Sequence, residues 1–419
     1  MGNWLLAEEN AATEGRVLAA KGGNMVKIVG MPARRVVAVV TVLGAMALWL
    51  TAAQPARADP VPGPNDVVGV GTDAMQYILD FGADGDIEGD PGYNDTGNTY
   101  RLTNFDATAD ANGRTVYGTN ILVPVNPTVV LRGGTSPIQR PDGGDAAISA
   151  LLADTAAIDP TLDYATIVSA PTATIPDVQP TTAEASQAEA SGWGGLEVFT
   201  LGTDSIQMAV ATTTNAPASG LTLAQLQGIY SCDAGYRNWD SADLGGGPNS
   251  AVIPLIAPPG SDIRTAFLDD LGLSDTGGCV ETAQPNDPTT IAGDPNAIAP
   301  FTLSRLNLWQ GVSGDTALAS DGVPYFDDPS DGYPGGTPLS PGITMLPGFS
   351  LPVLLNVIYR VSDQNSTLGW QPGSTLNWAQ SLFCDPGGAT PFFQTPAGQV
   401  LIAEAGADPA DQSCTADSP

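Results

Sequence analysis

Residues 251–273 constrain the fold more than any other stretch, because they combine one strand, one tight turn and one helix. Their sequence is AVIPLIAPPGSDIRTAFLDDLGL. Residues 252–257 are an apolar, β-prone run of the length of a buried strand, and a Pro-Pro-Gly turn ends them. Ser261 or Asp262 then caps a helix over residues 263–273. Such a unit points backbone N–H groups and the positive end of the helix dipole above the turn, so it is a candidate anion site.

A second unit of this kind is predicted earlier in the chain. Residues 127–131 are expected to form its strand, residues 140–145 (RPDGGD) its turn and residues 146–153 its helix. Further strand and helix patterns alternate along the chain, which favours an α/β fold with mostly parallel sheets and flanking helices. Because the elements are too many for one compact sheet, we expect two α/β lobes.

The N-terminal segment has the composition of an export signal. A short basic region precedes the apolar residues 36–53, and Ala-Arg-Ala at 56–58 predicts cleavage near Ala58. Residues 1–30 have no signal character, so the true start is expected at Met25 or Met31. The alternative is that residues 36–53 remain as a membrane anchor, since they are just long enough to span a bilayer. We expect an exported protein, whether periplasmic, wall-associated or extracellular.

The cysteines also indicate an oxidising compartment. An even number in an exported chain predicts two disulfides, and proximity along the sequence favours Cys232–Cys279 and Cys384–Cys414. The chain has no histidine and no CxxC spacing, which argues against a zinc site. Without histidine or a Gly-x-Ser-x-Gly elbow, we expect no enzymatic activity, and no cofactor is indicated.

The charge of the chain excludes several partners. Six of its 14 basic and three of its 45 acidic residues lie in residues 1–58, which leaves 8 basic and 42 acidic residues and a net charge of −34. Such a body would be repelled by nucleic acids and anionic membranes. A solubilising surface explains the acidity, and attraction of cations is the alternative.

Five stretches of the chain, taken in order, form a longer pattern. They are residues 70–76 (VGTDAMQ), 140–144 (RPDGG), 195–210 (GLEVFTLGTDSIQMAV), 221–239 (LTLAQLQGIYSCDAGYRNW) and 259–264 (PGSDIR). This series resembles the phosphate-type periplasmic substrate-binding proteins of ABC transporters, the PstS-like family. The fourth stretch is the most specific match, because it follows that family's L-T-x-x-Q-L-x-x-I-Y…N-W segment.

The resemblance implies a two-lobed type II periplasmic-binding-protein fold with a hinge. After the signal region, residues 1–58, lobe 1 would hold residues 59–200 and 346–419, and lobe 2 residues 201–345. The implied function is to clamp a small oxyanion, phosphate or phosphate-like, between the lobes for import through an ABC permease, by a monomer. The alternative is a secreted or wall-associated protein with a degenerate phosphate site that serves in scavenging, adhesion or signalling.

The resemblance also implies the ligand-binding residues, which lie on three loops. They are Thr72, Asp73, Ala74, Arg140, Gly143, Gly144, Asp145, Gly260, Ser261, Asp262 and Arg264.

Two of these residues, Asp145 and Asp262, depart from the family pattern and bring carboxylates to the site. One such charge costs about 4 kcal/mol at ~4 Å from an anion at an effective dielectric near 20. We therefore expect phosphate binding to be weakened or lost, with both carboxylates partly replacing the ligand; the alternative is that each caps its own helix. For Arg264 the alternative to ligand contact is a pair with Asp262 or Glu281.

An acidic loop partly fits a calcium-binding template. Its candidate ligands are Asp84, Asp86, Glu88 and Asp95, the last at the twelfth position. A solvated acidic loop without metal is the alternative interpretation.

Overall fold

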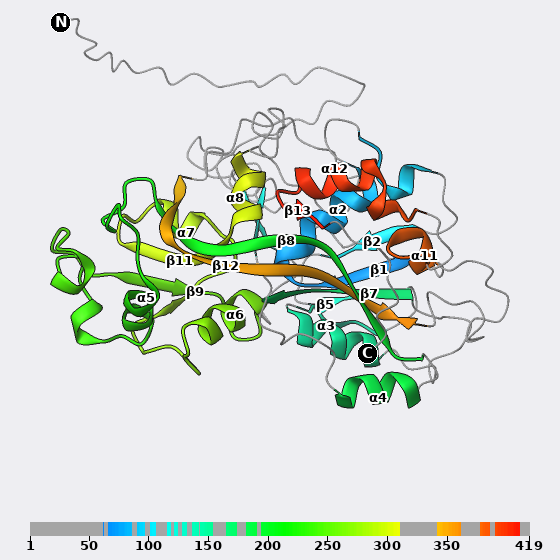
Figure 1. Cartoon of the computed structure of the whole chain (residues 1–419), viewed down its shortest axis with the longest axis horizontal. Coiled ribbons are helices and arrows are strands. Elements are labelled where there is room, and N and C mark those ends of the chain that lie inside the picture. The colour runs from blue at the N-terminus through cyan, green and yellow to red at the C-terminus, as the bar shows by residue number, and fades with distance from the viewer. Residues whose placement is uncertain are drawn as a thin grey trace, which may run out of the picture. The chain divides into compact units, whose positions relative to one another are not determined.

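A computed structural model provides the fold (Figure 1). It describes residues 62, 66–85, 90–96, 101–105, 115–118, 121–124, 128–131, 136–141, 143–153, 165–173, 182–190, 194–310, 342–361, 378–385 and 390–410. All of these belong to one compact unit, residues 56–419. The predicted signal region, Asp86, Glu88 and Cys414 lie outside the described residues.

A mixed sheet of nine strands organises the described residues, in the order β10-β9-β11-β8-β12-β7-β1-β2, with β13 also paired to β8. The strands are β1 (Val67–Gly71), β2 (Leu102–Asn104), β7 (Ala165–Ala173), β8 (Leu196–Ala211), β9 (Ile253–Ile256), β10 (Glu281–Thr282), β11 (Ala297–Thr302), β12 (Ile343–Arg360) and β13 (Asp408–Pro409). Strand β1 runs parallel to β2 and β7, and β9 runs parallel to β10 and β11. We call these sets the first and the second parallel group.

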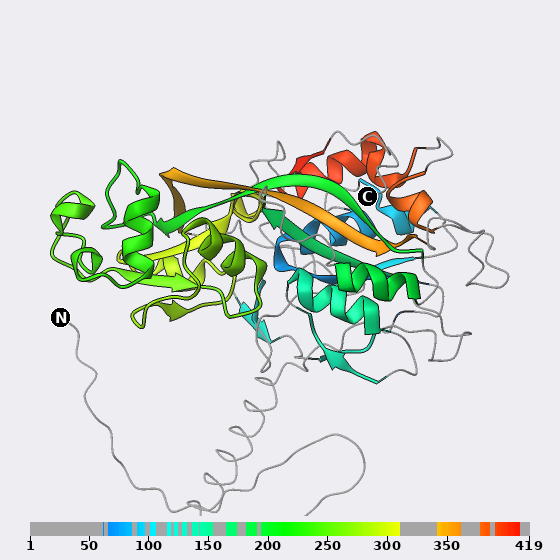
Figure 2. The same cartoon turned by 60° about the horizontal axis from the view of Figure 1, so that its bottom comes forward.

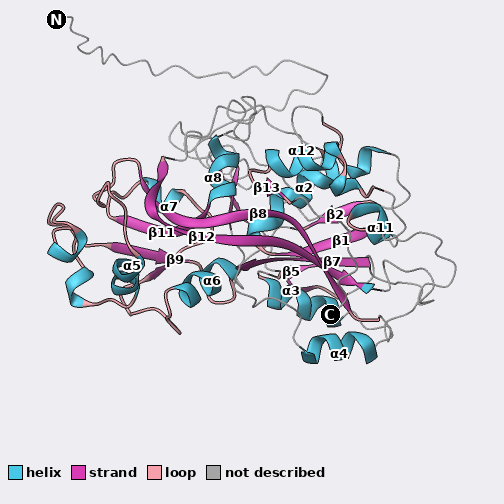
Figure 3. Cartoon of the chain, viewed as in Figure 1, coloured by secondary structure: helices cyan, strands magenta, loops and turns pink. Residues whose placement is uncertain are grey.

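Two long antiparallel strands, β8 and β12, join the two groups and run side by side (Figures 1 and 3). Strand β12 also pairs with β7 of the first group, and β8 with β11 of the second. The α/β class with flanking helices is thus confirmed, and the sheet is less parallel than expected, because all pairings of β8 and β12 are antiparallel. Both predicted lobe boundaries, after residues 200 and 345, fall inside these continuous strands, and the lobe division stays a prediction.

Helices cover the sheet on both sides (Figure 2). They are α2 (Gln76–Asp84), α3 (Gly144–Ala153), α4 (Thr182–Ala190), α5 (Leu223–Tyr230), α6 (Asp262–Asp270), α7 (Thr289–Ala292), α8 (Leu303–Gln310), α11 (Trp378–Leu382) and α12 (Pro396–Glu404). Short 3-10 turns lie at η1 (Asp73–Met75), η2 (Tyr93–Thr96), η3 (Ala234–Tyr236), η4 (Ala242–Leu244) and η7 (Phe392–Gln394). Within the described ranges, no helix is long and apolar enough to cross a bilayer.

The strand predicted over residues 127–131 is mostly wrong. The structure places only β5 (Thr128–Val129) there, and it pairs with β6 (Ile138–Gln139) in a small ladder outside the main sheet. The small strands β3 (Thr115–Gly118) and β4 (Ile121–Pro124) form another separate pair. The helix predicted over residues 146–153 is confirmed as α3, which begins two residues earlier at Gly144, so the second unit has its helix without a strand of the main sheet.

Buried aromatic side chains fix α5 and α6 against the second parallel group. The Tyr230 ring, at the end of α5, packs edge-on against Phe267 of α6, with 4.8 Å between ring centroids. The Tyr230 hydroxyl donates to the carbonyl oxygens of Leu255 (2.9 Å) and Ile298 (3.2 Å), and burial raises the pKa of Tyr230 well above its ordinary value. This packing sets where the N-terminus of α6 lies.

Candidate functional site

The two parallel groups direct their carboxyl ends toward each other. Because β7 and β8 are both antiparallel to β12, β1 and β7 run in the direction of β8, toward the second group. Strands β11 and β9 run against β8, toward the first group. Carboxyl ends of strands are where open α/β sheets place their binding sites. The candidate site therefore lies where the loops after β1 and β9 meet.

Three loops that are far apart in sequence touch at this place. The backbone N–H of Gly143 donates to the carbonyl oxygen of Gly71, 3.3 Å away. Gly143 has φ +104°, and a Cβ atom built on it would lie 2.3 Å from the carbonyl oxygen of Gly260. The loop before α3 thus lies between the loops after β1 and β9.

The carboxylate of Asp262 lies at the N-terminus of α3. The N–H of Gly144, the first residue of α3, donates to both Asp262 carboxylate oxygens, at 3.0 and 2.8 Å. Asp262 itself is the first residue of α6, so this contact links two helix N-termini. Asp145, the other carboxylate expected to replace a ligand, is exposed. The Asp262 carboxylate thus contacts Gly144, one of the residues predicted to bind the ligand, and the ligand position itself stays a prediction.

The loop after β1 uses its side chains in internal contacts. The hydroxyl of Thr72 accepts from the N–H of Ala74 at 3.4 Å and caps η1. The Asp73 carboxylate accepts from the Asn286 amide (2.6 Å) and the Arg305 guanidinium (3.2 Å). Both Thr72 and Asp73 are buried.

The sequence did not predict Asn286 and Arg305 as partners of Asp73. Asn286 carried a usable signal, since asparagine is among the few residues that adopt left-handed backbone, and Asn286 has φ +52°. Arg305 carried a weaker one, because it is one of only eight basic residues after residue 58. Nothing local in the sequence pairs either residue with Asp73.

Among the other predicted residues, Arg264 pairs with an acidic side chain, and Arg140 and Ser261 are buried. Arg140 is buried just before the loop that contains Gly143. Arg264 donates to the carbonyl oxygen of Ala257 (3.1 Å) and to the carboxylate of Asp275 (2.8 Å). The alternative of an ion pair is thus the one observed for Arg264, with a partner other than the two expected. Ser261 is buried at the N-cap of α6.

The acidic loop does not assemble a metal site among the described residues. The carboxylate of Asp84 accepts from the Asn94 amide at 2.7 Å and lies 3.7 Å from the guanidinium of Arg101. No group of three histidine, cysteine or acidic side chains that could hold a metal lies within the described ranges. With Asp86 and Glu88 outside those ranges, the calcium hypothesis stays a prediction.

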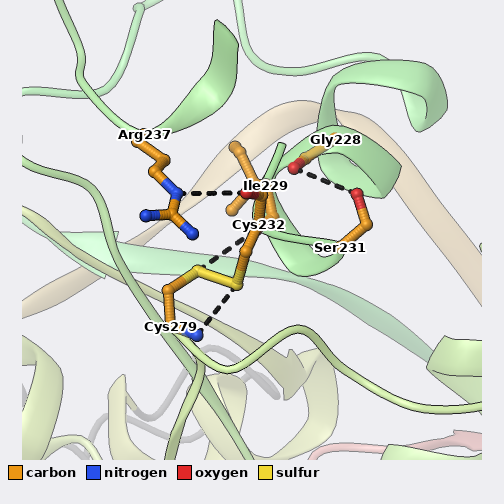
Figure 4. The surroundings of a disulfide bond; sticks show 6 residues. All are labelled: Gly228, Ile229, Ser231, Cys232, Arg237 and Cys279. Carbon is orange, nitrogen blue, oxygen red and sulfur yellow. Dashed lines mark hydrogen bonds between the residues drawn. A yellow bond between two sulfur atoms is a disulfide. The ribbon is translucent and has the colours of Figure 1, made fainter. Parts of the chain in front are cut away.

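The disulfide between Cys232 and Cys279 is confirmed (Figure 4). It connects the residue after the C-cap of α5 to the loop before β10, and the N–H of Cys279 lies 2.9 Å from the sulfur of Cys232. The side chain of Arg237 donates to the carbonyl oxygen of Cys232 at 3.0 Å. Cys384 is disulfide-bonded as well, and its predicted partner lies outside the described residues.

Asp204 lies on β8 between the segment that pairs with β13 and the segment that pairs with β11. Next to it, Thr203 pairs with β13 and Ile206 with β11. The Asp204 carboxylate accepts from the N–H groups of Ser205 (2.6 Å) and Ser304 (2.9 Å) and from the Ser304 hydroxyl, so it caps the first turn of α8. Burial raises the pKa of Asp204 from 3.8 to about 6, although the bonds from Ser304 and Ser205 and the charge of Arg305 lower it.

We expect Asp204→Asn to remove a pH dependence of stability. Because the folded pKa of Asp204 exceeds the unfolded one, its contribution to stability is full below about pH 4 and is lost as the pH rises through about 6. The asparagine keeps the shape and does not ionise, so its stability relative to wild type should rise between pH 4.5 and 7 by on the order of 2 kcal/mol. Urea unfolding at both pH values measures this, with exposed Asp145→Asn as the control. Parallel pH profiles of wild type and Asp204→Asn would contradict it.

Comparisons with known proteins give only distant likenesses. No model of a protein family matches the sequence, and no curated protein matches it. Among solved structures, a candidate phosphate ABC transporter substrate-binding protein of Clostridium perfringens, with bound phosphate, is similar at 11% identity over 83% of this chain and 100% of that one (TM-score 0.46). An ABC-type phosphate transport receptor of Vibrio cholerae is similar at 16% identity over 82% and 100% (TM-score 0.41).

A protein with a different bound molecule matches at a similar level. Corynebacterium glutamicum OxyR, in a mutant form with bound H2O2, is similar at 11% identity over 89% of this chain and 76% of that one (TM-score 0.35). A likeness in fold does not by itself determine what a protein binds.

Proposed function

We propose that the chain is an exported protein that binds a small oxyanion, phosphate or phosphate-like, at the N-terminus of α3. The observation that carries this proposal is the contact between the Gly144 N–H and the Asp262 carboxylate. A helix N-terminus that accepts a carboxylate has the donors and the dipole for an external oxyanion of similar size. Asp262 would then leave the position when a solute enters.

Competition with Asp262 sets the expected affinity. The internal carboxylate is held beside Gly144 by α6, so its effective concentration is high, and a free anion must displace it. A displaced Asp262 that stays nearby also repels the bound anion. Wild type should therefore bind phosphate weakly, with a Kd well above the micromolar range.

A second function is favoured by the same contact. If Asp262 never leaves, the protein keeps the scaffold with a filled site and serves outside the cell in adhesion, scavenging or signalling. The two functions differ in whether the site opens to an added anion, and only the first needs an ABC permease as partner. We expect a monomer in either case.

Export is supported by the cysteine chemistry. Stable disulfides are rare where thiols are kept reduced, and Cys232–Cys279 is bonded. The predicted cleavage near Ala58 is tested by mass spectrometry of the N-terminus of the protein secreted by its own host. A chain that still begins upstream of residue 36 would contradict it.

Asp262→Ala should increase phosphate affinity at least tenfold. The substitution removes the internal carboxylate while keeping a good helix former at the start of α6. Isothermal titration calorimetry with sodium phosphate at pH 7.5, on the purified mature chain, measures the affinity of wild type and variant. The expected result is a Kd in the millimolar range for wild type and a clearly lower one for Asp262→Ala.

Asp145→Ala is the matched control for this experiment. It also removes one negative charge from a helix first turn, but Asp145 is exposed and Gly144 keeps its contact with Asp262. We expect less than a threefold change in affinity. If Asp262→Ala binds phosphate no better than Asp145→Ala, the α3 N-terminus is not an anion site. Submicromolar binding by wild type would show that Asp262 does not compete.

A further inference from the structure

The contact of Asp262 with Gly144 is accompanied by a second set of contacts between the two parallel groups, centred on Asp73. Asp73 follows β1 of the first group, whereas Asn286 follows β10 of the second group and Arg305 lies on α8, directly after β11. The Asn286 amide donates to the Asp73 carboxylate at 2.6 Å. One Arg305 nitrogen donates to the same carboxylate oxygen at 3.2 Å and to the Asp73 carbonyl oxygen at 2.8 Å. The Asp73 carboxylate, after β1, is thereby bonded to segments that follow two strands of the second group.

These groups are almost fully buried. The exposed fractions are 1% for Asp73 and 4% for each of Asn286 and Arg305. The Arg305 guanidinium also lies 4.2 Å from the centroid of the Tyr77 ring, which accepts a cation on its face. Separating these partners would leave a buried carboxylate and a buried guanidinium without their main compensation, which is strongly unfavourable.

Hydrogen bonds from Thr302 orient the side-chain amide of Asn286. The side-chain oxygen of Asn286 accepts from the N–H (2.9 Å) and the hydroxyl (3.0 Å) of Thr302, which leaves the amide nitrogen toward Asp73. The left-handed backbone of Asn286 is an uncommon conformation for a residue other than glycine, and such conformations persist where surrounding contacts impose them.

Helix α8 is likewise anchored on several sides. Ser304 is held by the Asp204 carboxylate on β8, and the Asn307 amide donates to the carbonyl oxygen of Gly406 at 3.3 Å. A Cβ atom on Gly406 would lie 2.1 Å from the carbonyl oxygen of Ser304, so the segment after α12 packs directly on α8. Arg305 therefore reaches Asp73 from a fixed position.

We propose that Asp73, Asn286 and Arg305 form a latch that holds the first and second parallel groups together. This latch is separate from the oxyanion position at Gly144. It makes the arrangement in which the two groups are joined the ground state of the protein, so that joining them does not require solute binding. Opening requires the latch to break first, and any exchange of solute is limited by that step.

Asn286→Asp tests the latch by changing one charge and no shape. The new carboxylate would face Asp73 at hydrogen-bond distance, and two like charges there repel each other. Hydrogen exchange at pH 7.5 should become at least tenfold faster at the amides of Gly143 and Gly144, and small-angle scattering should give a larger radius of gyration. In wild type, 10 mM phosphate should leave the radius of gyration unchanged.

Two further variants separate the latch from general destabilisation. Asn215→Asp is the matched control, because the Asn215 amide is also hydrogen-bonded to a side chain, Asn296, at 2.8 Å but within the second group; exchange at Gly143 and Gly144 should stay as in wild type. The double variant Asp73→Asn with Asn286→Asp should keep the faster exchange, because the Asp73 oxygen that accepts from Asn286 also accepts from Arg305, so an amide nitrogen in its place would face the guanidinium. If Asn286→Asp does not fold, Asp73→Asn alone is compared, with the same faster exchange expected.

The outcomes distinguish this inference from the proposed function. Unchanged exchange at Gly143 and Gly144 in Asn286→Asp, or compaction of wild type on adding phosphate, would overturn the latch; the second result would at the same time support oxyanion binding. Faster exchange in Asn286→Asp together with no phosphate binding in any variant would support the latch and remove the oxyanion proposal.

Discussion

Replacing both Cys232 and Cys279 by serine is expected to lower the free energy of unfolding by roughly 4 kcal/mol. The disulfide closes a segment with a sequence separation of 47 residues, and the stabilisation by a cross-link grows with the length of the closed loop. The bond also fixes the loop that leads into β10 and on to Asn286. Guanidinium unfolding of the two proteins without reductant measures the difference.

Ser231→Ala is the control at the same helix end. It removes the bond from the Ser231 hydroxyl to the carbonyl oxygen of Gly228 (3.3 Å) and leaves the disulfide intact, so we expect a loss of about 0.5–1 kcal/mol (Figure 4). Equal unfolding midpoints for wild type and the double serine variant would show that the bond constrains little. Faster exchange at Gly144 in the double variant is expected too, since the loop before Asn286 is then less restrained.

Local signals in the sequence predicted the elements at the site. Thr222-x-x-Gln225 has the pattern of a capping box, and the box forms at the start of α5, with the Thr222 N–H 2.8 Å from the Gln225 side-chain oxygen. The strand and helix predicted within residues 251–273 appear as β9 and α6. These features depend on residues within a few positions of one another, which is why a single sequence suffices for them.

Long-range pairing could not be predicted in the same way. Residues 196–201 and 205–212 are each typical of a strand, yet β8 runs through both as one strand, since β12 pairs with nearly all of it and β13 pairs at Gly202 and Thr203. Nothing in the local sequence shows that a partner strand satisfies those backbone groups. The same limit hid the pairing of Asp73 with residues more than two hundred positions away.

The site residues show the same difference between features set by the local sequence and features set by long-range packing. A glycine-rich turn before α3 and an aspartate at the start of α6 are visible in the sequence, and they predicted a carboxylate near the anion position. Which helix Asp262 would contact was open, because its own helix and α3 both offer N–H groups. Only the packing of α6 through Phe267 decides for a contact with Gly144.

Gly143→Ala is expected to destabilise the fold by about 2–4 kcal/mol and to separate the three loops. At φ +104° any side chain is strained, and the added Cβ would lie 2.3 Å from the Gly260 carbonyl oxygen and 3.0 Å from an Asp262 carboxylate oxygen. Since Gly260 lies in the loop after β9 and Asp262 begins α6, the clash must push that loop and the start of α6 away from α3. Thermal unfolding and hydrogen exchange at Gly144 measure the two effects.

Gly195→Ala separates backbone strain from the clash between loops. Gly195 has a similar φ of +110°, but a Cβ there would meet only the Val361 side chain at 3.8 Å, an ordinary contact. The strain is therefore shared by both variants, at about 1–2 kcal/mol, and only Gly143→Ala should also speed exchange at Gly144. If the two variants lose equal stability and leave Gly144 equally protected, the loops after β1 and β9 do not meet around Gly143, and neither the oxyanion position nor the displacement of Asp262 would have a structural basis.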